Sequence, residues 1–270
     1  MPRKGITMSD ESQTKTAVVT GATGGLGACF ARRLVERGFS VLLTDRFANQ
    51  LDQLRDELAT ATDAPIEIFP CDLTDDAQLE SLAKRIASIE DLELLINNAG
   101  FATVGNFADI DEDLQSNMTR VHTMAPTRLA RAALPGMIER DSGAIINVSS
   151  LGAWLPAAGC VQYAATKAYL VTFSQALQEE LLGTNVQVQV LCPGFVKSGF
   201  HESDTMTEFD KSQVPSRMWS MPEPVVDYSL KSLSHHRLVA IPGWRNRLMG
   251  RFLQMPALRP IVRAVTRPKK

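Results

Sequence analysis

The sequence predicts an α/β protein built around one doubly wound parallel sheet. Seven short runs of aliphatic and β-branched residues alternate with longer stretches of helical periodicity, the order typical of parallel strands joined by crossover helices. No repeat or low-complexity linker divides the 270 residues, and 44% apolar residues can fill one large core. We therefore expect a single domain with a seven-stranded sheet.

The strands are expected where short apolar runs are bounded by turn-forming residues. In chain order they are Thr16–Thr20, Ser40–Thr44, Ile66–Phe69, Leu92–Ile96, Ala144–Val148, Val186–Leu191 and Leu238–Ile241. Gln187 and Gln189 alternate with valines in the sixth run. We therefore expect that strand to have one less apolar face and to depart from an all-buried parallel strand.

Helices are expected between these strands, each covering one face of the sheet. Gly38 ends the first helix, and the second carries leucines at i, i+3 and i+7. The expected ranges are Leu26–Arg37, Asn49–Ala59, Asp76–Ile89, Asp113–Ile138 and Val161–Leu182. Pro126 and Pro135 are the expected points of interruption in the fourth helix.

The alternating pattern defines a main domain at residues 16–241, and three segments depart from it. Residues 1–15 are expected to form a flexible polar lead, and residues 242–270 a C-terminal extension. Within the main domain, residues 199–224 contain acids, methionines and prolines and are too long for a simple connector. We expect them to form a lid over a substrate; a variable surface excursion is the alternative.

A glycine-rich turn directly follows the first strand. Its residues, Thr20-Gly21-Ala22-Thr23-Gly24-Gly25-Leu26-Gly27, open the first helix, where free N–H groups can hold the pyrophosphate of a dinucleotide. Gly21 can make the tight turn, Gly25 can let the backbone approach the dinucleotide, and Gly27 can bring helix and strand together. A merely structural turn is the alternative interpretation.

Asp45 ends the second strand, where a carboxylate can bind both hydroxyls of an adenosine ribose and repel a 2′-phosphate. Arg46 can instead pair with that phosphate or lie over the adenine. Because the glycine turn contains no Lys or Arg, the sequence favours NAD, with NADP as the alternative. Asp45 as a mere helix cap is the other interpretation.

The turn TGATGGLG, together with Asn97-Asn98-Ala99-Gly100 after the fourth strand, resembles the short-chain dehydrogenase/reductase family. The resemblance covers about residues 16–241 and implies a Rossmann-type domain that holds a nicotinamide dinucleotide. It also implies that Asn98, Ala99 and Gly100 flank the adenosine ribose and that Cys71, Asp72 and Leu73 meet the adenine. For Asp72, a solvent-facing or turn-forming role is the alternative.

Tyr163 and Lys167 lie four residues apart, which places both on one face of a helix. An ordinary helix surface can have this spacing, but Ser150 precedes Tyr163 by the thirteen residues that the family uses. A free tyrosine titrates near pH ~10, and a neighbouring cation favours the phenolate. We assign Tyr163 as the acid/base, Lys167 as its electrostatic tuner and Ser150 as the donor that orients the substrate oxygen.

His122 departs from the family pattern. Family members carry an asparagine in a Val-Asn pair that helps to hold a relay water near the lysine, whereas this sequence reads Val121-His122. His122 can still hold that water, and its titration near neutral pH would add a pH dependence. The alternative is a histidine packed in a helix with one satisfied nitrogen.

Residues 192–198, Cys-Pro-Gly-Phe-Val-Lys-Ser, resemble the family's segment beneath the nicotinamide carboxamide, with Ser198 in place of the usual threonine. The resemblance therefore implies a cofactor site drawn from the whole main domain. Its residues are Gly21, Thr23, Gly24, Gly25, Leu26, Gly27, Asp45, Arg46, Cys71, Asp72, Leu73, Asn98, Ala99, Gly100, Val121, Tyr163, Lys167, Pro193, Gly194, Val196 and Ser198.

Together these residues predict hydride transfer between a nicotinamide dinucleotide and a secondary alcohol or ketone. Apolar side chains near the catalytic segments favour an uncharged hydrophobic substrate. They are Trp154, Leu155, Pro156, Phe195, Phe200, Met206 and Trp219. One alternative is an NADPH-dependent ketone or 3-oxoacyl reductase, and another is a catalytically silent dinucleotide-binding protein with a regulatory or membrane-recruited role.

The composition of the chain limits the classes of partner and the cellular setting that we expect. A net charge of −2 and a pI near 6.1 argue against a nucleic-acid partner. Four scattered cysteines, Cys29, Cys71, Cys160 and Cys192, suggest neither a metal site nor disulfides, which fits a reducing, cytoplasmic setting. We expect neither secretion nor a membrane span. A homodimer or homotetramer through the two longest helices is usual in the family.

The C-terminal extension is locally basic. Residues 238–270 hold eight basic residues and no acid, and apolar residues are interspersed among them. The extension resembles an interfacial amphipathic segment and also a family subgroup with a basic end. Prolines break any long helix, so we expect docking on the same domain or a neighbouring subunit. Contact with a membrane surface or an acidic partner, and disorder, are the alternatives.

Overall fold

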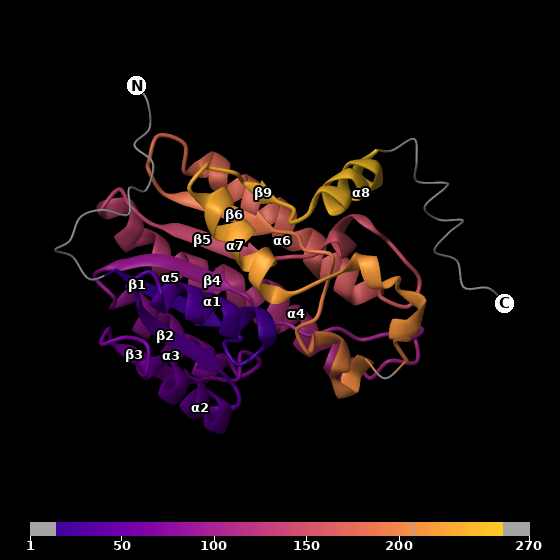
Figure 1. Cartoon of the computed structure of the whole chain (residues 1–270), viewed down its shortest axis with the longest axis horizontal. Helices are drawn as coiled ribbons and strands as arrows, with labels where there is room; N and C mark the ends of the chain where they lie inside the picture. Colours follow the sequence, from indigo (N-terminus) through magenta and orange to yellow (C-terminus); the bar gives the residue numbers. More distant parts are fainter. Residues whose placement is uncertain (1–14, 207, 256–270) are drawn as a thin grey trace.

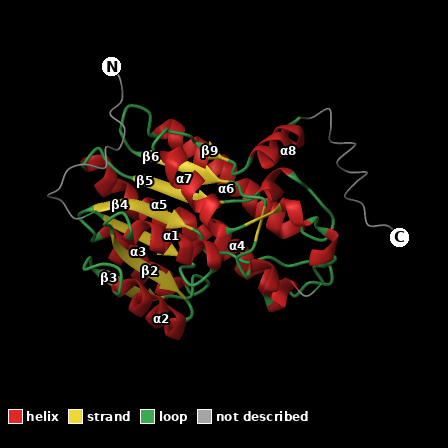
Figure 2. Cartoon of the chain, in the orientation of Figure 1, coloured by secondary structure: helices red, strands yellow, loops and turns green. Residues whose placement is uncertain are grey.

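The seven expected strands form one fully parallel sheet in the order β3-β2-β1-β4-β5-β6-β9. A computed structural model describes residues 15–206 and 208–255 (Figures 1 and 2), so most of the N-terminal lead expected at residues 1–15 and the end of the extension expected at residues 242–270 lie outside the described residues. The strands are β1 Thr16–Thr20, β2 Ser40–Asp45, β3 Ile66–Pro70, β4 Leu92–Asn97, β5 Ala144–Val148, β6 Gln187–Leu191 and β9 Val239–Ala240. The predicted doubly wound sheet is confirmed.

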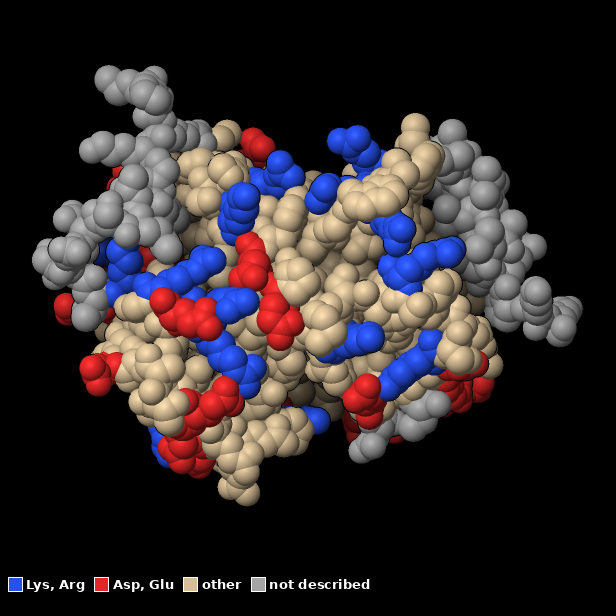
Figure 3. Space-filling model, viewed as in Figure 1, with Lys and Arg blue, Asp and Glu red and all other residues tan. Residues whose placement is uncertain are grey.

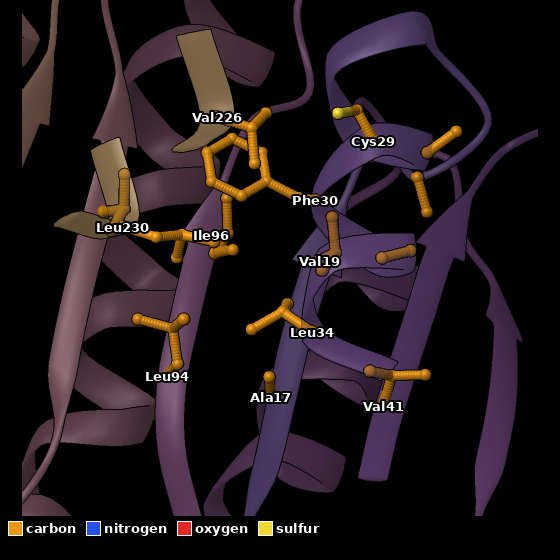
Figure 4. Close-up of a cluster of buried hydrophobic side chains, with 14 of the residues drawn as sticks. Ala17, Val19, Cys29, Phe30, Leu34, Val41, Leu94, Ile96, Val226 and Leu230 are labelled. Atoms are coloured by element: carbon orange, nitrogen blue, oxygen red, sulfur yellow. The ribbon is translucent and has the colours of Figure 1, made fainter. Parts of the chain in front are cut away.

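Helices cover both faces of this sheet, because each strand returns to the next through a crossover helix. One core layer contains α1, α2 and α7, and the other contains α3, α5 and the end of α6. The helices are α1 Gly25–Val35, α2 Ala48–Ala59, α3 Asp76–Ala87, α4 Glu112–Thr119, α5 Ala125–Glu139, α6 Val161–Glu180, α7 Pro222–Leu233 and α8 Trp244–Gln254. Figure 4 shows Phe30 of α1 between Val19 of β1 and Val226 of α7.

Strand β6 corrects one expectation, because it is buried on both faces. Gln189 is fully buried, and its Nε2 donates to the Ser229 carbonyl oxygen at 3.1 Å. The Ser229 hydroxyl donates back to Gln189 Oε1 at 2.5 Å. Helix α7, which the sequence analysis did not predict, therefore satisfies the buried Gln189 amide, whereas Oε1 of the buried Gln187 has no hydrogen-bond partner among the described residues.

The long helix expected at residues 113–138 is interrupted, but not by either proline. A π-helical turn at Arg120–Met124 joins α4 to α5, and Ala125 N donates to the Arg120 carbonyl oxygen in the i→i+5 pattern. Pro126 follows in the first turn of α5, where its missing N–H is tolerated. Helix α5 continues across Pro135.

Residues 199–224, which we call the lid segment, are built from 3₁₀ turns at residues 200–202, 204–206, 211–213 and 216–218. A small second sheet pairs β7 Phe195–Val196 with β8 Trp219–Ser220 and closes the segment on itself. The segment ends earlier than expected, because α7 begins at Pro222. None of the described helices is long and apolar enough to cross a lipid bilayer.

Candidate active site

The glycine turn is held so tightly that side chains are excluded. Gly21 has a φ of +62°, and a Cβ there would lie 2.7 Å from Ala99 Cα. A Cβ on Gly25 would lie 2.6 Å from Ser198 Cα, and Gly25 N donates to the Ser198 carbonyl oxygen. Helix α1 starts without a side-chain cap and without an acid in its first turn. Apart from Gly25 N, which the Ser198 carbonyl uses, the positive end of α1 therefore has no acidic side chain against it, which fits the pyrophosphate of a dinucleotide.

The Asp45 carboxylate lies against this turn. Its Oδ2 accepts hydrogen bonds from Thr23 Oγ1 at 2.7 Å and Thr23 N at 3.2 Å, and its Oδ1 accepts from Arg46 N at 2.7 Å. Helix α2 has Phe47 as its N-cap and no side-chain cap, which excludes the interpretation of Asp45 as a helix cap. The Arg46 guanidinium lies 4.8 Å from the centre of the Phe47 ring. Asp45 thus lies against the glycine turn, with Arg46 next to it at the end of β2.

Asn98 ties the glycine turn to the end of β4. Its Nδ2 donates to the carbonyl oxygens of Thr20 and Gly21, each at 3.0 Å. The backbone N–H groups of Asn98 and Ala99 both donate to Thr20 Oγ1. These bonds join the ends of β1 and β4, which is the switch point where doubly wound sheets bind ligands.

Two of the three residues after β3 that the resemblance assigns to the adenine, Cys71 and Leu73, have buried side chains. Asp72 Oδ1 accepts hydrogen bonds from Thr74 N and Thr74 Oγ1, so Asp72 forms a turn at the start of α3. The side chains of Cys71, Leu73 and Val121 lie in the core layer beneath, which leaves only their backbone to meet a nucleotide. Burial also raises the pKa of Cys71 to about 11.

Ser150, Tyr163 and Lys167 converge beyond the end of β5. A Cβ on Gly152 would lie 3.2 Å from Tyr163 Cε1 and 3.3 Å from Ser150 Oγ, so both side chains meet beside this glycine. Lys167 Nζ donates to the Val148 carbonyl oxygen at 2.9 Å and lies 5.7 Å from the centre of the Tyr163 ring.

Burial dominates the electrostatics of this group. It raises the pKa of Tyr163 to about 12, although the Ser150 hydroxyl acts in the opposite direction. Burial also lowers the pKa of Lys167 to about 8. Burial therefore sets the Tyr163 pKa in the chain alone, and the phenol keeps its proton at neutral pH.

His122 makes two hydrogen bonds that fix its tautomer. Phe101 N donates to His122 Nε2 at 3.1 Å, so the ring proton must lie on Nδ1 and be donated to Thr166 Oγ1 at 2.9 Å. Thr166 Oγ1 in turn donates to the Tyr163 carbonyl oxygen. Burial lowers the pKa of His122 well below its ordinary value, which contradicts the expected titration near neutral pH.

His122 links the loop after β4 to α6, the helix that carries Tyr163 and Lys167 and that we call the catalytic helix. A Cβ on Gly100 would lie 2.7 Å from His122 Nε2 and 3.4 Å from Lys167 Nζ. Both ring nitrogens are used by protein groups, whereas the alternative interpretation expected one. The π turn that carries His122 is of the kind often found at functional sites.

A buried polar chain supports the catalytic helix from below. Asn97 Nδ2 donates to Asn147 Oδ1 at 2.8 Å, and Asn147 Nδ2 donates to Ser174 Oγ at 2.9 Å. Ser149 Oγ donates to the Lys167 carbonyl oxygen at 2.7 Å, so this hydroxyl is used by the backbone of α6. The sequence analysis gave no role to Asn147, Gly152, Thr166 or Ser174, because only long-range contacts distinguish them from ordinary residues of their type.

The lid segment brings aromatic rings toward Tyr163. The Phe200 ring centre lies 6.1 Å from that of Tyr163. His201 is surrounded by the rings of Phe195, Phe200, Phe209 and Trp219 at 5.0–5.6 Å. The part of the lid segment that lies beside Tyr163 is thus rich in aromatic rings.

Fold and site together define an oxidoreductase that uses a nicotinamide dinucleotide. A family model described as short chain dehydrogenase matches residues 15–208. The chain belongs to this short-chain dehydrogenase/reductase family and is an NAD(P)-dependent oxidoreductase. Within residues 15–206 and 208–255, no group of three or more His, Cys, Asp or Glu is arranged to hold a metal ion.

Three known proteins illustrate the similarity. The very-long-chain 3-oxoacyl-CoA reductase of Bos taurus is 30% identical over 247 residues, covering 84% of this chain and 76% of the relative. A short-chain dehydrogenase from Sphingobium yanoikuyae, solved with NADPH, has a TM-score of 0.81 at 28% identity and covers 95% and 98% of the two chains. The bulky-bulky ketone specific alcohol dehydrogenase from Comamonas testosteroni has a TM-score of 0.79 at 27% identity, covering 96% and 97%.

Proposed function

We propose that this protein transfers a hydride between a nicotinamide dinucleotide and a hydrophobic secondary alcohol or ketone, with Tyr163 as the acid/base. The observation that carries the proposal is the convergence of Ser150, Tyr163 and Lys167 beside Gly152, at the same sheet edge as the glycine turn. When bound, the nicotinamide ring supplies or accepts the hydride at its C4 atom.

In ketone reduction, the Tyr163 hydroxyl gives its proton to the substrate oxygen while the carbonyl carbon gains the hydride and its electron pair. The Ser150 hydroxyl donates a hydrogen bond to that oxygen as negative charge develops. The Lys167 ammonium stabilises the phenolate left behind, and burial strengthens this attraction. Alcohol oxidation reverses these transfers. Because the pKa of Tyr163 is about 12 in the chain alone, the protonated phenol that reduction requires is the resting form.

The cofactor site proposed here keeps all the residues that the sequence assigned to it, with backbone contacts from Cys71, Leu73 and Val121. NAD is the proposed form, because the Asp45 carboxylate is fixed against the glycine turn and would repel a 2′-phosphate. NADP is the alternative, supported by the neighbouring Arg46 guanidinium and by the NADPH in the Sphingobium structure.

Isothermal titration of both dinucleotides into the wild type, Asp45→Ala and Arg46→Ala decides between them. If NAD is the cofactor, NADH binds more than about tenfold tighter than NADPH, or about 1.4 kcal/mol, and Asp45→Ala removes the difference. Tighter NADPH binding that disappears in Arg46→Ala would reverse the assignment.

The substrate is proposed to be uncharged and hydrophobic because Phe200 lies beside Tyr163 and belongs to the aromatic cluster around His201. The relatives' names, a very-long-chain 3-oxoacyl-CoA reductase and a bulky-bulky ketone specific enzyme, agree with a large apolar site. Cofactor absorbance with a panel of bulky ketones, 3-oxoacyl thioesters and their alcohols tests turnover. Dinucleotide binding without turnover of any member would favour the catalytically silent, regulatory alternative.

His122 is proposed to act as a positioning residue rather than as the holder of a relay water, because protein groups use both of its nitrogens. The protein is further proposed to work in the cytoplasm as a homodimer or homotetramer. Exposed Val161 and Tyr169 on α6, together with Met124 in the π turn before α5, are suited to a subunit contact.

A further inference from the structure

The outer face of α8 carries an apolar stripe. Trp244, Leu248 and Phe252 recur at i, i+4 and i+8, so they share one face of a helix with 3.6 residues per turn, and Met255 directly follows the last turn. Their exposed fractions are 64%, 49%, 49% and 52%. Exposure of three large apolar side chains in one row on a surface helix, followed by exposed Met255, is unusual and marks a contact surface.

The opposite face of α8 is anchored to the catalytic domain. Gly250 lies against Leu151 and Ile241, where a Cβ would come within 3.3 Å of both side chains. Asn246 Nδ2 donates to the Pro242 carbonyl oxygen, and the Asn246 side chain packs on Gly194. The stripe is therefore presented outward by a helix that also contacts the segments following Ser150 and β6.

Positive charge borders the stripe on both sides. Arg245 follows Trp244 on one side, and the helical period places Arg251, with Arg247 behind it, on the other. The Arg247 guanidinium is turned toward the domain, where it lies 5.6 Å from the centre of the Tyr228 ring and donates to the Ile241 carbonyl oxygen. Among the described residues, none of these three arginines forms an ion pair. Figure 3 shows the region of α8 as an uncharged ridge with Lys and Arg atoms beside it. The sequence of residues 256–270 adds five basic residues and no acid.

We propose that α8 docks on an anionic lipid surface, with its apolar stripe inserted between headgroups and its arginines at the level of the phosphates. Tryptophan favours the membrane interface, and arginines that flank an apolar face can reach the headgroups while their stems stay apolar. A second copy of the chain fits this face less well. A two-fold contact through the stripe would bring the arginines of both copies together.

Docking in this way would place the substrate side of the site close to the lipid surface. Helix α8 packs on the 3₁₀ turn Leu151–Trp154, which directly follows Ser150. A hydrophobic substrate could then reach the site from the lipid phase. The docking itself concerns binding alone and does not depend on which ketone or alcohol is turned over.

The experiment is flotation of the full-length protein with two kinds of vesicle, pure phosphatidylcholine and phosphatidylcholine with about 30% phosphatidylserine. We expect binding to the anionic vesicles that weakens as salt is raised. Leu248→Ser/Phe252→Ser should reduce this binding about tenfold or more. Leu182→Ser is the matched control, because Leu182 is 57% exposed outside α8 and its loss should change nothing.

Quenching of tryptophan fluorescence by brominated lipids provides a second readout, and Trp244→Phe should abolish it. Equal binding by the wild type and the Leu248→Ser/Phe252→Ser variant, or no binding to anionic vesicles, would overturn the proposal. So would a fall in assembly mass by light scattering in that variant without a change in vesicle binding, because the stripe would then be a subunit contact. Thermal unfolding of each variant checks that the fold is retained.

Discussion

The glycine turn and the lid segment both border the catalytic residues, but the chain holds them in different ways. Backbone contacts fix the glycine turn: Gly25 bonds to Ser198, and Asn98 bonds to two carbonyl oxygens of the turn. Aromatic side chains around His201 and short 3₁₀ turns hold the lid segment. Positions packed closely against backbone, as in the glycine turn, accept few residue types. An aromatic cluster such as the one around His201 can be formed by many combinations of residues. The cofactor side is therefore the constrained half of the site and the substrate side the adaptable half.

Removal of the Tyr163 hydroxyl should have the largest effect, because both halves depend on it. In Tyr163→Phe, kcat should fall about 10²–10⁴-fold, the usual contribution of a positioned proton donor. The dissociation constant of the dinucleotide should stay nearly constant, since the glycine turn is untouched. Steady-state cofactor absorbance and isothermal titration measure the two quantities. Retention of near wild-type kcat would exclude Tyr163 as the acid/base.

Two glycine substitutions compare the halves directly. In Gly25→Ala the new methyl group would meet the Ser198 backbone at 2.6 Å, so the turn must shift, at a cost of about 1–3 kcal/mol and up to about a hundredfold weaker dinucleotide binding. Gly199→Ala meets no atom within 4 Å and bears only local strain from a φ of +77°. Its dinucleotide affinity should match the wild type. Equal losses in both variants would remove the proposed difference in constraint.

The pH dependence of reduction should reflect Lys167. Its pKa is lowered to about 8, so the ammonium is present below that pH and lost above it, while Tyr163 stays protonated to about 12. We expect kcat/KM for reduction to be highest below pH 8 and to fall by up to about tenfold per pH unit above it. Because His122 stays neutral, His122→Asn should keep the same profile. Disappearance of the fall in that variant would make His122 the titrating group.

Loss of the hydrogen-bond chain through His122 and Thr166 should lower kcat moderately. Both His122→Asn and Thr166→Val break the link from Phe101 N to the Tyr163 carbonyl oxygen, so each should lower kcat about tenfold. Because they break the same chain, the double variant should lose little more than either single variant. Additive losses in kcat would show that the two residues act separately. Thermal unfolding should report the cost of the unsatisfied buried groups, about 1–3 kcal/mol.

Phe200→Ala should have the smallest effect and should be confined to the substrate half. The Phe200 ring lies 6.1 Å from Tyr163 and makes no hydrogen bond with the cofactor-side residues. We expect KM for bulky ketones to rise by less than about tenfold, in keeping with partial loss of one apolar contact. The dinucleotide affinity should not change. A larger effect on the dinucleotide would mean that the lid segment also holds the cofactor side.

The sequence predicted the sheet well because its strands are short apolar runs separated by amphipathic helices. It placed Ser150, Tyr163 and Lys167 through fixed spacings along the chain. It did not predict α7, although Pro222 stands at its first helical position, because the lid segment before it lacks a clear period. The burial of Gln189 was also missed, because its partner Ser229 lies on that unpredicted helix.

The site residues that escaped prediction are those whose roles depend on distant contacts. Thr166 matters because its hydroxyl meets His122, 44 residues away in sequence. The effect of burial on the pKa of Tyr163 was likewise not predicted, since pattern alone pairs it with Lys167 and does not weigh the loss of water.

The π turn between α4 and α5 determines how these two helices are rotated relative to each other about their common axis. An i→i+5 turn contains one more residue than an α-helical turn, so everything before it is rotated by about 100° relative to everything after it. This offset lets α5 pack on α3 while α4 and the π turn face α6. A deletion of one residue within Arg120–Met124 would make the helix continuous and swing α4 off the catalytic helix. The extra residue thus changes which face of the helix points to each neighbour, so that residues 112–124 contact α6 while α5 contacts α3.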